Sequence, residues 1–392
     1  MVSRACDCGA LPATITVSEF GGPSGVSEWH LAVTPTGSGS IETQLGWLEE
    51  TYRQALAAAG LGPDTAVLRR FFCSDLANQA SALAARPFSD PAHGAEPCAV
   101  SWTEQPPAPP AKVALWAYHV SDPAGPLNKR LAGHTLTVQR AELAHHWTTG
   151  LTCPAAGGPY EQTAGILEQY EAFLRAGKIA LADHVIRTWF FVQDIDANYH
   201  GLVAARREHF AARGLTPDTH YIASTGVGGG HADPTATVTM DAYAVSGVRP
   251  EQIAFLAAPD HLSPTHVYGV TFERGVAVSY ADRRHVLISG TASIDRAGHI
   301  LHPGDVSRQL DRTLENIAAL LGQAGAGFDE VGMLIVYVRD PADLGLAREL
   351  MRERFGDAPL VVAVAPVCRP GWLIEVECQA VVEADHPGLP AF

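Results

Sequence analysis

The sequence is short of positive charge, and of lysine in particular. Its 392 residues include 27 lysines and arginines against 42 aspartates and glutamates, which gives a formal net charge of −15. Lysine occurs only as Lys112, Lys129 and Lys178. A surface this acidic repels phosphate backbones, so we expect no nucleic-acid partner. It also repels small anions at long range, so an anionic substrate would need local arginines.

Long hydrophobic runs and paired cysteine motifs are also missing. No stretch approaches the length of about 18 apolar residues that a membrane helix needs, and the first residues lack the apolar segment of a signal peptide. The seven cysteines are scattered, with no pair of CxxC motifs and no zinc-binding spacing. We therefore expect a cytoplasmic protein with no metal site and no membrane partner.

Three predicted helices, at 42–56, 161–174 and 307–321, share one pattern and indicate an internal repeat. Each carries a glutamine, and each is followed by an apolar, strand-like run that ends in an aspartate. The pairs are Gln44 with Asp75, Gln162 with Asp194, and Gln309 with Asp340, at offsets of 31, 32 and 31 residues. This regular spacing predicts three copies of one unit. Asp305 is the expected N-cap of the third helix.

Each copy also has a strand-like run before its helix and another at its end, and a second helix is visible at 197–214 and 343–355. The order strand, helix, strand, helix, strand predicts an α+β fold whose units each have a mixed sheet with helices on one face. Loops rich in proline, glycine and polar residues place the units at 1–125, 126–248 and 249–392. The glycine cluster at 226–230 is interpreted as a turn, because a strand and not a helix follows it.

The last copy carries motifs that resemble the RidA/YjgF family: ISGTAS at 288–293, QLDRTLENI at 309–317, VYVRD at 336–340 and IEVE at 374–377. Members of that family are homotrimers with sites between neighbouring subunits. The resemblance therefore implies a monomer in which three fused units form a pseudo-threefold trimer. RidA deaminases hold the substrate carboxylate with an arginine at a position where this chain has Leu360, which speaks against ordinary deaminase activity.

A more specific resemblance lies in the same copy. HLSPTHVYGVTFERGVAV at 261–278, ISGTASIDRAGHILHPGDVSRQLDRTLENI at 288–317 and VCRPGWLIEVE at 367–377 follow one another as in the chorismatases. Those enzymes cleave the enolpyruvyl group of chorismate. The resemblance implies a cofactor-free enzyme that forms pyruvate together with a dihydroxycyclohexadiene carboxylate or 3-hydroxybenzoate.

Glu375 is the residue on which this chemistry would depend. Aligning the three closing strands on their ends places Glu375 opposite Thr239 and Ala114, so only the third copy keeps a carboxylate there. Along its strand, Glu375 shares the polar face with Glu377, for which we expect ordinary solvent exposure. Resemblance to the chorismatases makes Glu375 the general acid that protonates the methylene carbon of the enol ether. That role requires burial, which keeps a carboxyl protonated at neutral pH.

Chorismate carries two carboxylates, so arginine forks should hold it. The resembling motifs and the middle unit together supply the expected substrate-binding residues, which are Arg274, Arg369, Tyr268, Cys368, Ser289, Gly290, Thr291, Arg187 and Arg206. Cys368 aligns with a position whose side chain differs between chorismatase subtypes, and a cysteine there favours the 3-hydroxybenzoate type.

Two other functions remain open at the level of sequence. One is a related enzyme that acts on another imine, enamine or enol ether in a biosynthetic pathway. The other is a non-catalytic member that binds a small anionic metabolite without turnover. A fold alone does not separate these functions. The carboxylate at position 375, beside the Cys-Arg-Pro turn at 368–370, favours an enzyme.

Overall fold

The structure is a computed structural model of the chain and describes residues 1–6, 9, 11–90 and 97–392. Within these residues the strands form three six-stranded sheets, one for each copy of the repeat. The strands of the three sheets lie within 1–125, 126–248 and 249–392, and the boundaries between these segments stay a prediction. The expected α+β architecture of three mixed-sheet units is confirmed.

The elements follow the same order in each unit, except that the middle unit has an additional short helix, α4. The first unit contains β1 (Val2–Ala5), β2 (Ala13–Gly21), β3 (Ser27–Pro35), α1 (Ile41–Ala58), β4 (Ala66–Cys73), α2 (Leu76–Ala84), β5 (Ala99–Glu104) and β6 (Val113–Ser121). The middle unit contains β7 (Asn128–Ala132), β8 (Thr135–Arg140), β9 (Leu143–Leu151), α3 (Pro159–Ala176), α4 (Leu181–His184), β10 (Val185–Val192), α5 (Ile195–Ala211), β11 (Ala223–Gly228) and β12 (Val238–Ser246). The third unit contains β13 (Ile253–Leu256), β14 (Gly275–Ser279), β15 (Arg283–Ala292), α6 (Val306–Gln323), β16 (Val331–Val338), α7 (Leu344–Phe355), β17 (Leu360–Val364) and β18 (Ile374–Glu383).

The closing strand of each unit lies inside its sheet. In the third unit, for example, β18 pairs antiparallel with β15 on one side and with β16 on the other, and β16 pairs parallel with β17 at the edge. The strand orders β1-β2-β3-β6-β4-β5, β11-β10-β12-β9-β8-β7 and β13-β14-β15-β18-β16-β17 repeat this arrangement. A residue on a closing strand is therefore held by hydrogen bonds on both sides.

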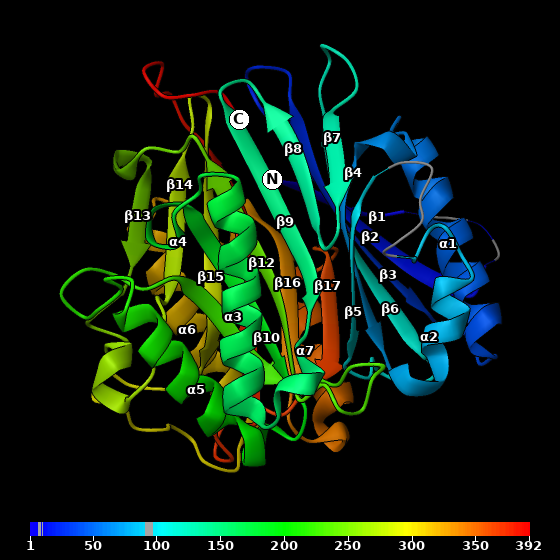
Figure 1. Cartoon of the computed structure of the whole chain (residues 1–392). Coiled ribbons are helices and arrows are strands. Elements are labelled where there is room, and N and C mark those ends of the chain that lie inside the picture. Colours follow the sequence, from blue (N-terminus) through cyan, green and yellow to red (C-terminus); the bar gives the residue numbers. More distant parts are fainter. Residues whose placement is uncertain (7–8, 10, 91–96) are drawn as a thin grey trace.

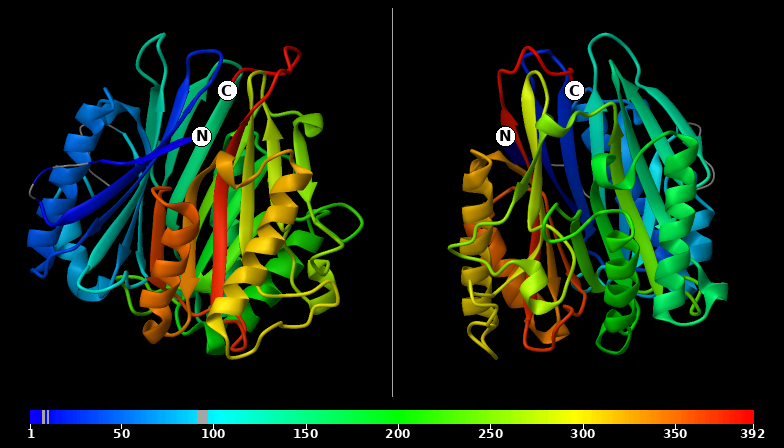
Figure 2. Two further views of the ribbon diagram at one scale, coloured as in Figure 1. Left: turned by 180° about the vertical axis from the view of Figure 1, so that it is seen from behind. Right: turned by 60° about the vertical axis from the view of Figure 1, so that its left-hand side comes forward.

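The long helices lie on the outer faces of the sheets, and the sheets face one another around a central axis (Figures 1 and 2). One buried cluster contains residues of all three units, among them Trp116, Trp189 and Tyr337. Three further clusters, one in each unit, pack the helices of that unit onto its own sheet. The side chains on the inner faces of the three sheets thus form the core between the units.

The repeated glutamine has a structural function that the spacing alone does not reveal. In the third unit, Nε2 of Gln309 donates to the carbonyls of His302 and Gly371, and its Oε1 accepts from the backbone N–H of Leu373. Gln44 and Gln162 make the same type of contacts in their own units. Each glutamine therefore joins the loop before its helix to the segment that leads into the closing strand. Asp305 caps α6 as expected, accepting from Arg308 N at 3.0 Å.

The structure contains elements that the sequence pattern did not predict. Each sheet has two additional strands before its first predicted strand and a parallel strand after its second helix, such as β11 and β17. The interpretation of 226–230 as a turn was wrong, because Gly226 and Gly228 belong to β11. A side chain at Gly228 would overlap Pro366 of the third unit, so this glycine permits a close contact between two units.

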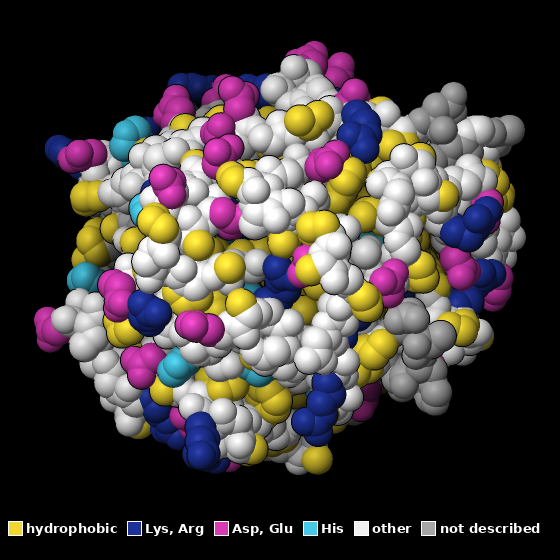
Figure 3. Space-filling view, turned by 90° about the horizontal axis from the view of Figure 1, so that it is seen from above, with side chains coloured by type: hydrophobic (Ala, Val, Ile, Leu, Met, Phe, Trp, Pro, Cys, Tyr) yellow, Lys and Arg dark blue, Asp and Glu magenta, His cyan; other side chains and the backbone are white. Residues whose placement is uncertain are grey.

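Seen from above, acidic and basic side chains are interspersed over the surface (Figure 3). In the part of the chain that the structure describes, no helix is both long and apolar enough to cross a membrane. The expected cytoplasmic location stays a prediction.

Candidate active site

A pocket of about 490 Å³, open mouth included, lies between the middle and the third unit. Helix α5 and strand β11 of the middle unit contribute one side, and the segments around β14, β15 and β18 of the third unit contribute the other. Seven of the expected site residues line this pocket, namely Glu375, Arg274, Arg369, Tyr268, Cys368, Gly290 and Arg206.

Glu375 is the second residue of β18 and is held from both sides. It pairs with Tyr337 on β16 and with Ala292 on β15, and its exposed fraction is only 5%. Burial, followed by the nearby charge of Glu377, raises the pKa of Glu375 to about 8, although Arg274 and Arg187 act in the opposite direction. At neutral pH the side chain is therefore mainly a neutral carboxylic acid that can donate a proton.

Gly290 gives the Glu375 carboxyl the space it needs. The pairing of β15 with β18 shifts register between Ile288 and Thr291, and Gly290 lies in this irregular segment. A Cβ atom at Gly290 would overlap Oε1 of Glu375. Gly290 is one of the expected substrate-binding residues, and the side chain that approaches it in the structure is the Glu375 carboxyl.

Two arginines of the third unit enclose Tyr268 at the pocket. The Tyr268 ring centroid lies 5.3 Å from the guanidinium carbon of Arg274 and 4.7 Å from that of Arg369. Arg274 donates to the carbonyl of Ser263 at 2.8 Å, and Arg369 donates to the carbonyl of Tyr268 at 3.2 Å. The Nε of Arg274 is buried and has no hydrogen-bond partner among the described residues. Both guanidinium groups are thus held at the pocket by hydrogen bonds, and Arg274 keeps one N–H that can still donate.

The middle unit adds a third arginine and residues that the sequence did not identify. Arg206 on α5 is buried and donates to Oγ of Ser224 at 3.3 Å, while its Nη2 finds no partner within the described chain. Tyr199, also on α5, and Ser224, on β11, line the pocket as well. Across from Tyr199, burial raises the pKa of the Cys368 thiol to about 12, so this cysteine is a neutral thiol at pH 7. No motif in the sequence pointed to Tyr199 or Ser224.

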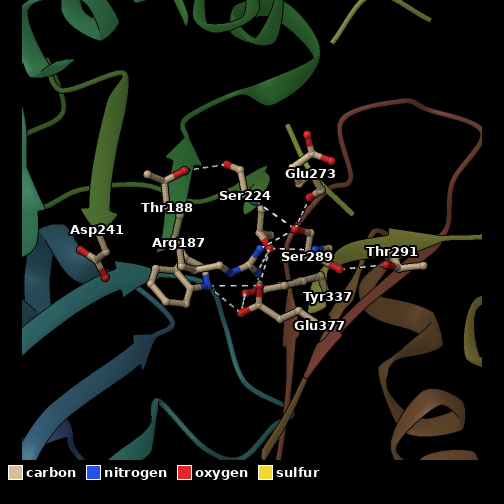
Figure 4. A network of polar contacts seen from close by, with 12 residues as sticks. Arg187, Thr188, Ser224, Asp241, Glu273, Ser289, Thr291, Tyr337 and Glu377 are labelled. Carbon is tan, nitrogen blue, oxygen red and sulfur yellow. Dashed lines mark hydrogen bonds and ion pairs between the residues drawn. The ribbon is translucent and has the colours of Figure 1, made fainter. Parts of the chain in front are cut away.

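Arg187, Ser289 and Thr291 are not among the residues that line the pocket. The Oγ of Ser289 accepts from Nη1 of Arg187 at 2.7 Å and donates to the carbonyl of Glu273 at 2.6 Å. Thr291 donates to the carbonyl of Ser289 at 2.8 Å. Arg187 and Ser289 thus join the two units, and Thr291 contacts Ser289 within the third unit (Figure 4). The expected contact of these three residues with a substrate stays a prediction.

The expected exposure of Glu377 was wrong, because its exposed fraction is 4%. Its carboxylate accepts from Nη2 of Arg187 at 2.6 Å, from Nε1 of Trp189 at 2.9 Å and from the hydroxyl of Tyr337 at 3.1 Å. The hydroxyl of Thr225 also donates to it. Three of these four donors belong to the middle unit, and Figure 4 shows Arg187 reaching Glu377 from the neighbouring sheet. Glu377 is buried because a partner charge is buried with it.

Leu360, which stands at the arginine position of RidA deaminases, does not line this pocket. It is the first residue of β17 and lies on a groove between the third and the first unit. The strand of the middle unit that corresponds to β17 is β11, and Ser224 on β11 has the same pairing position as Leu360. Neither residue is an arginine, so the departure from the RidA pattern holds at both interfaces.

The register of the three closing strands agrees with the alignment made on sequence. Glu375, Thr239 and Ala114 pair with Tyr337, Phe191 and Phe72, each of which stands three residues before the repeat aspartate. The carboxyl of Glu375 is therefore not repeated at the equivalent positions of the first and middle units. In the described part of the chain, no three His, Cys, Asp or Glu side chains come together as potential metal ligands.

Comparison with known proteins agrees with this architecture. A family described as endoribonuclease L-PSP matches residues 275–382. A chorismatase of Streptomyces rapamycinicus is 32% identical over 49% of this chain and 62% of that protein, which is less than two thirds of its length. A 3-hydroxybenzoate synthase of Streptomyces hygroscopicus is 28% identical over 61% of this chain and 79% of that protein.

Two further comparisons concern the family and the fold. A RutC family protein of Pyrococcus abyssi is 35% identical over 25% of this chain and 79% of that protein. A crystal structure of a chorismatase covers 81% of this chain and 94% of its own, with a TM-score of 0.60 at 18% identity, and so shares the fold. The chain therefore belongs to the RidA/YjgF family, which includes the RutC proteins, as three units fused into one polypeptide.

Proposed function

We propose that the chain is an enzyme that cleaves the enolpyruvyl ether of chorismate, with Glu375 as its general acid. The single observation that carries this proposal is a buried carboxylic acid, with a pKa raised to about 8, in a pocket lined by three arginines. The names of the relatives, a chorismatase and a 3-hydroxybenzoate synthase, support the choice of substrate.

The proposed reaction begins with transfer of the Glu375 proton to the methylene carbon of the enol ether. Protonation of carbon is difficult at neutral pH, and a carboxyl that is still protonated there is suited to it. The step leaves an oxocarbenium ion and a Glu375 carboxylate, and the new negative charge stabilises the cation next to it. Addition of water and loss of the ring alcohol then gives pyruvate and a dihydroxycyclohexadiene carboxylate.

A ring hydroxyl can take the place of water as the nucleophile. Rearrangement and loss of pyruvate would then give 3-hydroxybenzoate, with no net consumption of water. We favour this outcome because Cys368, at the position that differs between chorismatase subtypes, is a neutral thiol on the pocket wall. Neither route calls for a cofactor.

We assign the substrate carboxylates to the arginines of the pocket. Arg274 and Arg206 each retain a buried guanidinium nitrogen with no hydrogen-bond partner among the described residues. An unpaired buried donor is costly, and an anionic ligand that accepts from it removes this cost. The two arginines come from different units, so the proposed substrate would bridge the third and the middle unit.

The direct test is incubation of the purified protein with chorismate, following pyruvate and identifying the aromatic product by mass. We expect pyruvate from the wild type and a loss of at least about 100-fold in rate for Glu375→Gln, as for removal of a general acid. Glu383→Gln, at the exposed end of the same strand, is the matched control and should retain activity. Full activity of Glu375→Gln would overturn the assignment. No pyruvate from a folded wild type would redirect the search to imines, enamines and other enol ethers.

A further inference from the structure

The ion pair behind the pocket lies within one strand position of the proposed acid. Glu375 and Glu377 are two residues apart on β18, so their side chains point to the same face of the sheet, about 7 Å apart along the strand. Arg187 of the middle unit is within 2.6 Å of the Glu377 carboxylate and is itself only 1% exposed. Two buried acidic groups and one buried cation therefore share a water-poor region.

Glu375 and Glu377 differ in the hydrogen bonds that their carboxyls accept. Glu377 accepts from Arg187, Trp189, Thr225 and Tyr337, which stabilise a carboxylate. No hydrogen bond to the carboxyl of Glu375 is found among the described residues. A carboxylate paired with a buried guanidinium is a fixed negative charge, and such a charge opposes ionisation of a neighbouring acid.

Resting on the function proposed above, we propose that Glu377 is a positioning residue that keeps Glu375 protonated. It does so in two ways: it places a fixed negative charge beside Glu375, and it binds the Arg187 guanidinium that would otherwise stabilise a Glu375 carboxylate. The device crosses the unit boundary, because the acid pair belongs to the third unit and Arg187 and Thr225 belong to the middle one.

The other charged and titratable groups around Glu375 cannot replace this effect. Arg274, from the segment before β14, favours the ionised form of Glu375. Arg369 and Arg206 line the same pocket and are also cations, and Tyr268 and Cys368 are neutral there at pH 7. Tyr337, the cross-strand neighbour of Glu375 on β16, is neutral as well and donates to Glu377. Among these groups, Glu377 alone opposes the cations.

The interface between the first and the middle unit contains a natural control. Asp241 has the position on β12 that Glu377 has on β18, and it accepts from Arg70 at 2.9 Å and from Ser101 at 2.6 Å. This pair is as deeply buried as the Arg187–Glu377 pair. The residue two positions before it is Thr239, not an acid. Asp241 therefore serves the packing of two units without a neighbouring carboxyl to influence.

The first experiment measures ionisation of Glu375 without any substrate. Infrared difference spectra between the wild type and Glu375→Gln, recorded from pH 5 to pH 10, isolate the carbonyl band of the protonated Glu375 carboxyl. We expect the band to persist at pH 7 in the wild type. In the Glu377→Gln background its midpoint should fall by about one pH unit or more. In the Asp241→Asn background it should not move. A midpoint unchanged by Glu377→Gln would overturn the proposal.

A second variant covers the case in which Glu377→Gln, with its unpaired buried arginine, does not fold. The double variant Arg187→Met/Glu377→Gln removes both charges. The midpoint of the band should therefore fall by less than it does in Glu377→Gln. If only the double variant folds, the midpoint should fall by less than about one pH unit relative to the wild type. A larger shift would contradict the role given to Arg187. The basic limb of the pH profile of kcat/KM should move with the band.

The infrared and kinetic results separate this inference from the proposed function. A band that shifts in a protein without activity on chorismate would support the acid pair and reject the substrate. If the protein is active on chorismate but Glu377→Gln changes neither the midpoint of the band nor the pH profile of kcat/KM, the proposed function is supported and the role of Glu377 is rejected.

Discussion

The carboxyl of Glu375 fits into its site because residue 290 is a glycine. A methyl group at that position would overlap Oε1 of Glu375 and would also lie only 3.0 Å from Cγ2 of Thr225 in the middle unit. Gly290 itself is held by a hydrogen bond from its N–H to Oγ1 of Thr225 at 2.8 Å. Proton transfer depends on placement within a fraction of an ångström, so this contact is one on which the proposed activity should depend.

Gly290→Ala should therefore displace the Glu375 side chain. We expect kcat/KM for chorismate to fall by roughly 100-fold, because a 1 Å misplacement of a reacting group has effects of this size. The measurement is steady-state kinetics together with a thermal melt. Gly322→Ala is the control, since Gly322 lies in α6 with nothing within 4 Å of an added Cβ, and it should leave kcat/KM unchanged. An active Gly290→Ala protein would show that the carboxyl does not need this space.

The sequence motifs led to residues of the third unit that line the pocket, and they failed at contacts between units. Arg274, Arg369 and Cys368 lie in motifs next to Glu375 in the third unit, so a local pattern could identify them. The environment of Glu377 depends on Arg187, which is 190 residues away in the chain. General exposure rules for glutamate then gave the wrong result. Tyr199 and Ser224 reach the pocket from the middle unit in the same way, without any motif.

At the scale of elements, the repeated glutamine fixes the approach to each closing strand. Gln309 binds Gly371 O and Leu373 N, only two residues before Glu375. Gln162 makes the equivalent contacts before β12, which carries Thr239 and no acid. The same substitution can therefore be made at both glutamines, and only Gln309 lies next to the proposed acid.

Gln309→Met and Gln162→Met should each lower the free energy of unfolding by roughly 2–4 kcal/mol, because each leaves buried backbone groups without partners. Only Gln309→Met should also reduce kcat, since the start of β18 loses its support. Chemical denaturation and kinetics on both variants provide the measurement. Equal kcat values in the two variants would show that the placement of Glu375 does not depend on the hydrogen bonds of Gln309.

The sequence predicted the long helix and the central strands of each unit, and it located the second helix of the middle and third units but not α2 or the edge strands. The predicted helix at 307–321 corresponds to α6 (Val306–Gln323), whose apolar stripe at i, i+3 and i+4 spacing is continuous. Strands β1 and β7 are four and five residues long and mostly exposed, so their residues show little apolar alternation. The glycines of β11 mimic a turn because neighbouring groups leave little room for side chains there, namely Tyr199 of the same unit at Gly226 and Pro366 of the third unit at Gly228.

At the scale of the molecule, the centre of the pseudo-trimer contains buried histidines. Burial lowers the pKa of His30 to about 4 and that of His145 to about 3. Both lie on a cavity near the axis, with Glu28 of the first unit and His285 of the third. An unfolded chain binds protons at these histidines below about pH 6.5, whereas the folded chain does not.

The free energy of unfolding should therefore be largest above pH 6.5 and fall as the pH decreases toward 4. Each of the two histidines contributes a slope of about 1.4 kcal/mol per pH unit in that range. Urea denaturation at several pH values measures this slope. Replacing His145 by glutamine should reduce this slope by about 1.4 kcal/mol per pH unit, whereas replacing the exposed His299 should leave the slope unchanged. A stability that stays constant from pH 6.5 to 4.5 would mean that these histidines titrate normally in the folded protein.

The asymmetry of the three interfaces follows from their fusion into one chain. Separate identical subunits would carry the same residue at the positions of Glu375, Thr239 and Ala114, whereas here each unit has its own. The middle unit then supplies Arg206, Tyr199 and the Arg187 partner of Glu377 to a pocket whose proposed acid belongs to the third unit.

The central claim is that Glu375 acts in its protonated form, and the pH dependence of kcat/KM for pyruvate release from chorismate tests it most directly. A general acid with a pKa of about 8 predicts a constant kcat/KM from pH 6 to 7 and a tenfold fall for each pH unit well above 8. Glu375→Gln should lack this dependence along with most of the activity. A kcat/KM that instead rises with pH through the ordinary range of a carboxyl group would show that the carboxylate is the active form and would contradict the account.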